Sequence, residues 1–125
     1  MEITEKTILL VDDDPFILDL VGRFLTAKGF RVLSTTDPEK AYKLAESEVP
    51  RLIISDIAMP GLDGFTLFKG FKNNKVTSRI PLVLLTGSDK LADIEKGFAA
   101  GAQAYLLKPV DWTTAWPKLE PLLHD

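Results

Sequence analysis

Four short stretches of the sequence carry side chains that suit the handling of a phosphoryl group and a divalent cation. An acidic run from Asp12 to Asp14 stands early in the chain, and another carboxylate, Asp56, follows later. Crowded carboxylates repel one another unless a cation compensates them, and Mg²⁺ typically binds one or two carboxylates with waters and a phosphate oxygen. Thr86 offers a hydroxyl donor and Lys108 a compact positive charge. Such groups neutralise and position a transferring phosphoryl group, with a carboxylate as the nucleophile.

The elements that must position these residues can be predicted from the hydrophobic pattern. Short apolar runs typical of buried strands lie at Thr7–Val11, Phe30–Leu33, Arg51–Ser55, Leu82–Leu85 and Ala104–Leu107. Segments with helical spacing of apolar residues separate them. Strands that are apolar throughout and joined by helices indicate a parallel sheet covered on both faces, and right-handed crossovers make it a doubly wound α/β domain.

The helices carry start signals and apolar stripes. Asp14 and Asp37 are each followed by proline, the pattern of a cap and a first helical residue, and Ser88 or Asp89 is expected to cap the fourth helix. The predicted core-facing stripes of the first and fourth helices comprise Ile17, Leu20, Val21, Phe24 and Leu25, and Leu91, Ile94 and Phe98.

In a doubly wound sheet, functional residues gather at the carboxyl ends of the strands. Asp12 to Asp14 follow the first strand, whereas Asp56, Thr86 and Lys108 end the third, fourth and fifth. Each of these residues, taken alone, could have a purely structural role, since Asp caps helices and Thr begins turns. Asp14 in particular is interpreted as a helix cap. Their arrival at one sheet edge favours a phosphoryl-transfer site, with Asp56 as the candidate nucleophile because it faces the acidic run alone.

Composition limits the remaining classes. The chain has 125 residues, 46% of them hydrophobic, which is enough for one domain, residues 1–125, with a real core. Its net charge of −3 argues against direct binding to nucleic acid or an anionic membrane. It has no cysteine for disulfides or thiolate metal sites, and no apolar leader or long apolar run. A soluble cytoplasmic protein is therefore expected.

At this point the sequence resembles the receiver domain of two-component response regulators. The matching pieces are ILLVDDDP (8–15), LIISDIAMPGLDGF (52–65), LVLLTGS (82–88) and GAQAYLLKPV (101–110). They occur in order and span essentially the whole chain. The resemblance implies a five-stranded parallel sheet in the order 2-1-3-4-5 with five helices, and a phosphorelay role with a histidine kinase or histidine phosphotransfer protein as the phosphodonor.

The resemblance also implies the roles of the site residues. Asp56 matches the phosphorylated aspartate, with weak self-phosphorylation and autodephosphorylation expected. Asp12 and Asp13 match the acidic pair that organises Mg²⁺, Asp13 and Asp56 as direct ligands and Asp12 largely through water. The backbone carbonyl of Ala58 would be a further ligand. Lys108 matches the lysine of the motif, and its bond to Pro109 is expected to be cis.

Conformational signalling and docking are implied as well. Thr86 resembles a switch hydroxyl that moves toward the phosphoryl group, and Tyr105 resembles an aromatic rotamer switch that follows it. The surface of the fourth helix, fifth strand and fifth helix then changes and is read by an output partner or domain. Receivers usually offer their first helix and the loop after the fifth strand to the kinase, which points to Phe16, Leu18 and Pro109 as docking residues.

Some positions depart from the family pattern. Ala58 and Ser88 are small where the family tunes hydrolysis of the acyl phosphate, so no special protection of the phosphoryl group is expected. Gln103 and Ala104 stand where winged-helix regulators carry acidic residues for a charge-paired dimer. That dimer is therefore not expected, and a monomer or weak dimer is predicted.

Three other functions fit the sequence less well. Asp12-x-Asp14 superficially matches the first motif of haloacid dehalogenase phosphatases, but Phe16 stands where a small β-branched residue is needed and a later acidic motif is missing. A flavodoxin-type protein needs a Ser/Thr/Gly-rich phosphate loop after the first strand, where the acidic run would repel phosphate. A degenerate receiver used only for interaction is disfavoured by the intact site set.

Overall fold

The chain forms one parallel sheet with helices on both faces. The computed structural model describes residues 6–56, 58–59, 62–87 and 89–123. The sheet has five strands in the order β2-β1-β3-β6-β7. Their bounds are Arg31–Thr35 (β2), Thr7–Val11 (β1), Leu52–Asp56 (β3), Leu82–Thr86 (β6) and Ala102–Leu107 (β7). All four pairings are parallel, so the predicted order 2-1-3-4-5 is confirmed.

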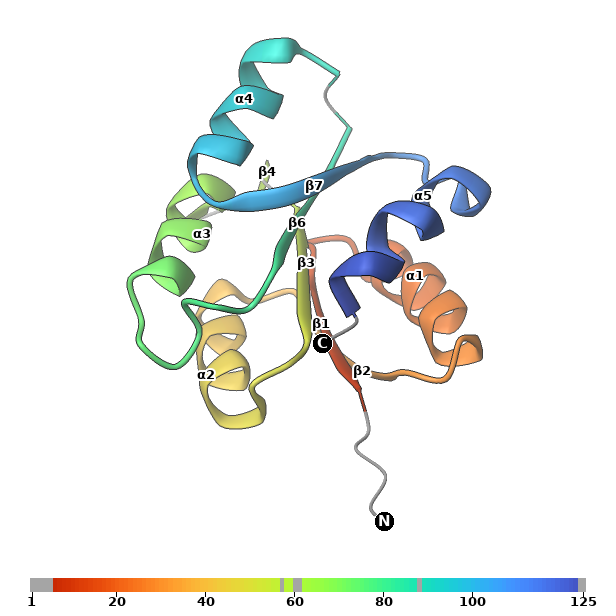
Figure 1. Ribbon diagram of the computed structural model, residues 1–125, viewed down its shortest axis with the longest axis horizontal. Coiled ribbons are helices and arrows are strands. Elements are labelled where there is room, and N and C mark those ends of the chain that lie inside the picture. Colours follow the sequence, from red (N-terminus) through yellow and green to blue (C-terminus); the bar gives the residue numbers. More distant parts are fainter. Residues whose placement is uncertain (1–5, 57, 60–61, 88, 124–125) are drawn as a thin grey trace.

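The helices divide between the two faces of this sheet. In the part of the chain that the structure describes they are α1 (Pro15–Ala27), α2 (Pro38–Glu48), α3 (Gly64–Lys72), α4 (Leu91–Ala99) and α5 (Trp112–Leu119), the last continued by a 3-10 turn at Glu120–Leu123. Helices α1 and α5 cover one face, and α2, α3 and α4 cover the other (Figure 1). Two short antiparallel strands, β4 (Ala58–Met59) and β5 (Leu62–Asp63), connect β3 to α3.

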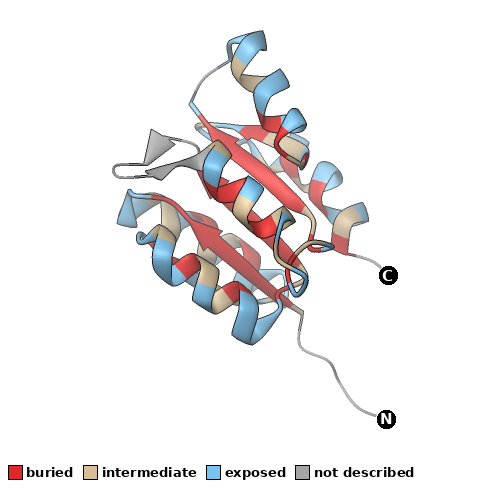
Figure 2. Cartoon of the chain, turned by 90° about the vertical axis from the view of Figure 1, so that its left-hand side faces the viewer, coloured by how far each residue is buried: buried red, intermediate tan, exposed pale blue. Residues whose placement is uncertain are grey.

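The core follows from the alternation of side chains along the strands. β1, β3 and β6 are buried at every position, and the exposed residues of the helices lie on their outer sides (Figure 2). Leu9, Ile53 and Leu84 pack beneath α2 and α3. Their sequence neighbours Ile8 and Ile54 point the other way, toward α1 and α5. Runs that are apolar throughout are needed because helices cover both faces.

Caps fix where several helices begin, and therefore where the strand-end loops turn. The side chains of Asp14, Asp37 and Asp111 each accept a hydrogen bond from a backbone N–H two residues later, at 2.9, 2.9 and 3.0 Å. Proline follows the first two caps, as predicted. The predicted cap of α4 is wrong: its N-cap is Lys90, which makes no side-chain capping hydrogen bond, and Ser88 lies outside the described residues.

The predicted stripe of α1 is confirmed except at Leu20, and the predicted stripe of α4 is wrong at Leu91 and Phe98. Leu20 of α1 is 51% exposed, and Leu91 and Phe98 of α4 are 68% and 44% exposed. The buried side of α4 instead carries Gly97, because the helix packs so closely on the sheet that a Cβ there would lie 2.6 Å from Cδ2 of Leu84.

Strand β2 begins one residue later and ends two residues later than predicted, since its ladder with β1 runs from Arg31 to Thr35. The Lys108–Pro109 peptide is cis, as the resemblance implied.

Within the described residues, no helix is both long enough and apolar enough to cross a membrane.

Candidate functional site

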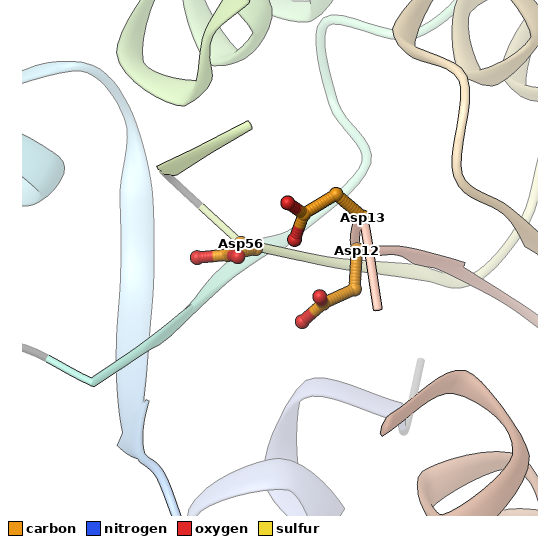
Figure 3. A group of neighbouring side chains, drawn as sticks. All are labelled: Asp12, Asp13 and Asp56. Atoms are coloured by element: carbon orange, nitrogen blue, oxygen red, sulfur yellow. The ribbon is translucent and has the colours of Figure 1, made fainter. Parts of the chain in front are cut away.

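Three carboxylates meet at the carboxyl ends of the central strands. Asp12 and Asp13 directly follow β1, and Asp56 is the last residue of β3, which pairs with β1. Each offers one oxygen, and these oxygens all lie within 4.8 Å of one another. Figure 3 shows the side chains turned toward a shared space from the two strand ends. Asp12 is fully buried and Asp56 is 5% exposed, whereas Asp13 is exposed.

Lys108 reaches this cluster from the end of β7. Its Nζ lies 2.8 Å from Oδ2 of Asp12 and donates a hydrogen bond of 3.3 Å to Oδ2 of Asp56. Its backbone N–H donates to the carbonyl of Thr86 at 2.7 Å, which joins the ends of β6 and β7. Thr86 is buried at the end of β6. The strand-end prediction for Asp12, Asp13, Asp56, Thr86 and Lys108 therefore holds for their positions, while their roles stay predictions.

Burial and charge act against each other in this cluster. Burial raises the pKa of the Asp12 carboxyl, and the hydrogen bond from Lys108 only partly offsets that effect. Burial alone would lower the pKa of Lys108, but the hydrogen bond and charge of Asp12 and the charge of Asp56 together raise it. The site thus holds a firmly protonated ammonium beside a carboxylate whose negative charge is costly.

The donor set fits a hard divalent cation. Three carboxylate oxygens are ligands that Mg²⁺ takes, and Mg²⁺ keeps waters in its remaining positions. Oδ2 of Asp12 is buried, and its contact with Lys108 is an ion pair of 2.8 Å without the alignment of a good hydrogen bond. A cation, or its bound water, would add a partner to that oxygen and further compensate the charge that burial disfavours.

The substitution Asp12→Asn is expected to raise the free energy of unfolding of the metal-free protein by about 1 kcal/mol near neutral pH. The pKa of Asp12 is raised in the folded protein, so the wild type gains stability as pH falls through that pKa. The advantage of the variant should therefore shrink toward about pH 4. Urea unfolding with a chelator present, at both pH values, measures this. Asp14→Asn, at the exposed cap, is the control, and a less stable Asp12→Asn protein at neutral pH would contradict the argument.

The predicted switch residues lie on neighbouring strands. Thr86 pairs with Leu107, and Tyr105 pairs with Leu84. Tyr105 is half-buried, and its ring contacts Phe98 of α4 and the ammonium of Lys118 of α5. Neither contact was predicted, because no sequence spacing indicates which helix residues reach a given ring of the sheet.

The docking residues divide into exposed and half-buried positions. Phe16 is 67% exposed and Pro109 is exposed, as a docking surface requires. Leu18 is half-buried and packs against the core, and its role in docking stays a prediction. Leu20, predicted to be in the core, is the exposed apolar residue of α1 one turn after Phe16. Ala58 lies in β4, and its carbonyl as a metal ligand stays a prediction.

Comparison with known proteins agrees with this geometry. The family model of the response regulator receiver domain matches residues 8–115. The chain is 37% identical over 117 residues to the DNA-binding dual master transcriptional regulator RpaA of Synechocystis, and 38% identical over 104 residues to the response regulator PleD of Caulobacter vibrioides. These matches cover 94% and 83% of this chain but 48% and 23% of the two relatives. The chain thus spans about half of RpaA and a quarter of PleD.

Solved structures show the same architecture. The chemotaxis response regulator CheY4 of Vibrio cholerae superposes with a TM-score of 0.88 at 29% identity, covering 96% of this chain and all of that one. A putative response regulator from Chloroflexus aurantiacus gives a TM-score of 0.90 at 29% identity, with 96% and 98% covered. Fold and site define a doubly wound α/β domain with an acidic pocket at its strand ends. The chain belongs to the family of response regulator receiver domains.

Proposed function

We propose that this protein accepts a phosphoryl group on Asp56, in a Mg²⁺-dependent reaction, from a histidine kinase or a histidine phosphotransfer protein. The observation that carries the proposal is one cluster: three carboxylates with oxygens within 4.8 Å, and a lysine whose ammonium reaches Asp12 and Asp56 at 2.8 and 3.3 Å. Such a cluster combines a nucleophile, a cation site and a fixed positive charge, which phosphoryl transfer requires.

The transfer itself is a displacement at phosphorus. A carboxylate oxygen of Asp56 forms a bond to the phosphorus of phosphohistidine while the phosphorus–nitrogen bond breaks, and the imidazole leaves with the electron pair of that bond. Lys108 already lies against Asp56 and would donate to the incoming phosphoryl oxygens. Thr86, buried at the end of the next strand, supplies a hydroxyl on the same edge.

The acidic pair would hold the cation beside this nucleophile. Asp13 and Asp56 are the proposed direct ligands, with the carbonyl of Ala58, and Asp12 acts largely through water. Bound Mg²⁺ neutralises the charge that gathers as the donor approaches Asp56. We further propose weak self-phosphorylation from small donors and slow autodephosphorylation, without an enzymatic role toward other substrates.

Phosphorylation would act by shifting a conformational equilibrium. Phosphoryl oxygens that bind Thr86 and Lys108 better in one conformer favour that conformer by the difference in binding. We propose that Thr86 moves inward, Tyr105 follows, and the face of α4, β7 and α5 changes for an output partner or domain. That face carries exposed apolar side chains at Leu91, Phe98 and Leu107, which fits a protein-binding surface.

The proposal is tested by intact mass spectrometry after incubation with acetyl phosphate, with Mg²⁺ and with a chelator instead. One phosphoryl adduct that requires Mg²⁺, and that peptide mapping places on the segment containing Asp56, is the expected result. No adduct with acetyl phosphate or with any phosphorylated histidine phosphotransfer protein would overturn the phosphoacceptor role.

We also propose where the phosphodonor docks. Phe16 and Leu20 expose apolar side chains one turn apart on α1, and Pro109 is exposed directly after Lys108. Phe16 follows Asp14, which caps α1 next to the acidic pair. A helical donor bound there would bring its phosphohistidine over the strand ends. Leu20 joins Phe16, Leu18 and Pro109 as a proposed docking residue, because it is 51% exposed.

Phe16→Ala combined with Leu20→Ala is expected to slow transfer from a phosphorylated phosphotransfer protein about tenfold or more. The rate with acetyl phosphate should stay unchanged, because a small donor needs no helix surface. Transfer is measured by quenching the reaction at a series of times and following the labelled phosphoryl group on gels as it moves from the phosphotransfer protein to this chain. Val76→Ala, at an exposed apolar residue between α3 and β6, is the control. Equal slowing with acetyl phosphate would indicate damage to the site instead of lost docking.

We also propose the domain content, location and oligomeric state of the protein. Residues 1–125 act as a single receiver domain in the cytoplasm, as a monomer or weak dimer, without binding nucleic acid or membrane. RpaA is described as DNA-binding and is about twice as long as the match.

A further inference from the structure

The ring of Tyr105 lies on the same side of the sheet as Thr86. Tyr105 pairs with Leu84, and Thr86, two residues after Leu84, pairs with Leu107. Side chains two residues apart on a strand share a face, and directly paired residues of parallel strands do too. Tyr105 and Thr86 are therefore diagonal neighbours on the face covered by α3 and α4. A displacement of Thr86 changes the space next to the Tyr105 ring.

Two side chains from different helices hold this ring. The Phe98 ring of α4 meets it edge-on, with centroids 6.2 Å apart and planes at 86°. The ammonium of Lys118 in α5 lies 5.1 Å from its centroid. Lys118 and Tyr105 also line one recess of about 310 Å³ between β7 and α5, together with Asp111 and Thr114. The ring thus bridges the two helices that flank β7.

Both contacts depend on the position of the ring. Edge-to-face aromatic pairs and cation–π contacts require a defined centroid distance and orientation. A Tyr105 side chain that turned away, toward space vacated by Thr86, would lose both at once. Contacts made in only one of two conformers bias the equilibrium toward that conformer. A single cation–π contact at an exposed site changes such an equilibrium about two- to fivefold.

We propose that Phe98 and Lys118 are positioning residues that hold Tyr105 between α4 and α5 and thereby oppose the conformational change driven by phosphorylation. This inference rests on the proposed phosphoacceptor role of Asp56. Phe98 and Lys118 hold the Tyr105 ring in its resting position. Removing either side chain therefore favours the phosphorylated conformer before any phosphoryl group arrives.

The test uses fluorine NMR of the full chain labelled with 3-fluorotyrosine. The chain has two tyrosines, Tyr42 and Tyr105, so the spectrum has two resonances and Tyr105→Phe assigns them. Tyr42 packs on Phe71 between α2 and α3 and serves as an internal reference. Spectra of wild type, Lys118→Met and Phe98→Leu are compared with wild type plus acetyl phosphate and Mg²⁺, and initial phosphorylation rates are measured in parallel.

In Lys118→Met, the Tyr105 resonance should move part of the way toward its position in the phosphorylated wild type, and the phosphorylation rate should rise about two- to fivefold. Lys118→Arg and Phe98→Tyr keep the cation and the ring, and should restore the wild-type rate. Lys96→Met is the matched control, because Lys96 of α4 lies 5.0 Å from the ring centroid of Phe65, away from Tyr105.

A Tyr105 resonance and a rate equal to wild type in both Lys118→Met and Phe98→Leu would overturn the restraint while leaving the phosphoacceptor role intact. A rate increase of the same size in Lys96→Met would also overturn it, since any loosening of α4 would then suffice. Absence of an adduct in every protein, with the Tyr105 resonance still displaced by Lys118→Met, would overturn the phosphoacceptor role and leave the ring restraint standing.

Discussion

Asp56→Asn is expected to abolish the phosphoryl adduct that the wild type gains from acetyl phosphate and Mg²⁺. An amide cannot form the acyl phosphate, because its oxygen carries no full charge and its nitrogen is not nucleophilic. The substitution changes one atom of a side chain that is 5% exposed, so the fold should persist. Intact mass spectrometry of both proteins under identical conditions, with thermal unfolding to verify folding, measures the loss.

Asp14→Asn is the matched control for this experiment. Asp14 belongs to the same acidic run but caps α1 through its side chain, and asparagine caps helices about equally well. It should gain the adduct at the wild-type rate. An adduct on Asp56→Asn that maps to Asp12 or Asp13 would show that another carboxylate of the cluster is the acceptor.

Asp13→Asn is expected to weaken Mg²⁺ binding about tenfold or more, measured by isothermal titration calorimetry. It removes one of the three carboxylates whose oxygens meet at the site, and with it one negative charge. Asp13 is exposed, so the free energy of unfolding without metal should change by no more than about 0.5 kcal/mol. Loss of affinity would therefore reflect the ligand itself.

Asp12→Asn, at the buried residue next to Asp13, should change stability differently from Asp13→Asn. Asp12→Asn should also weaken Mg²⁺ binding, but it should stabilise the metal-free protein, since the charge of Asp12 is buried. Two substitutions of adjacent residues thus lower the same affinity with different effects on unfolding. Wild-type affinity in Asp13→Asn would mean that the cation is held without that carboxylate.

Sequence reasoning predicted the site well because the fold follows a simple rule. Strands that are apolar throughout indicate a parallel sheet, and residues after such strands meet at one edge. Asp12, Asp56 and Lys108 are far apart in sequence, yet the rule places them together, and the structure brings the lysine within 3.3 Å of both carboxylates.

Helix orientation could not be predicted in the same way. Periodicity identifies residues that share a face but not which face meets the sheet. Leu91 and Phe98 share a face of α4, and that face points outward because Gly97 allows the helix to approach Leu84 closely. Gly97 marks the buried side of α4, but a glycine has no apolar side chain and so does not contribute to a hydrophobic pattern. In α1 the predicted face does meet the sheet, and Leu20 alone lies outside it. Contacts such as that of Lys118 with Tyr105 depend on two helices packing at once.

The aromatic packing between α1 and α5 determines what an optical signal from this protein reports. Trp112 stacks on Phe24 at 4.1 Å, and Trp116 meets the rings of Phe24 and Phe30. The chain has two tryptophans, and both pack on the side of the sheet opposite Tyr105, so the tryptophan emission originates there. Tryptophan emission should therefore follow the separation of α5 from α1 on denaturation, because both indole rings pack between these helices.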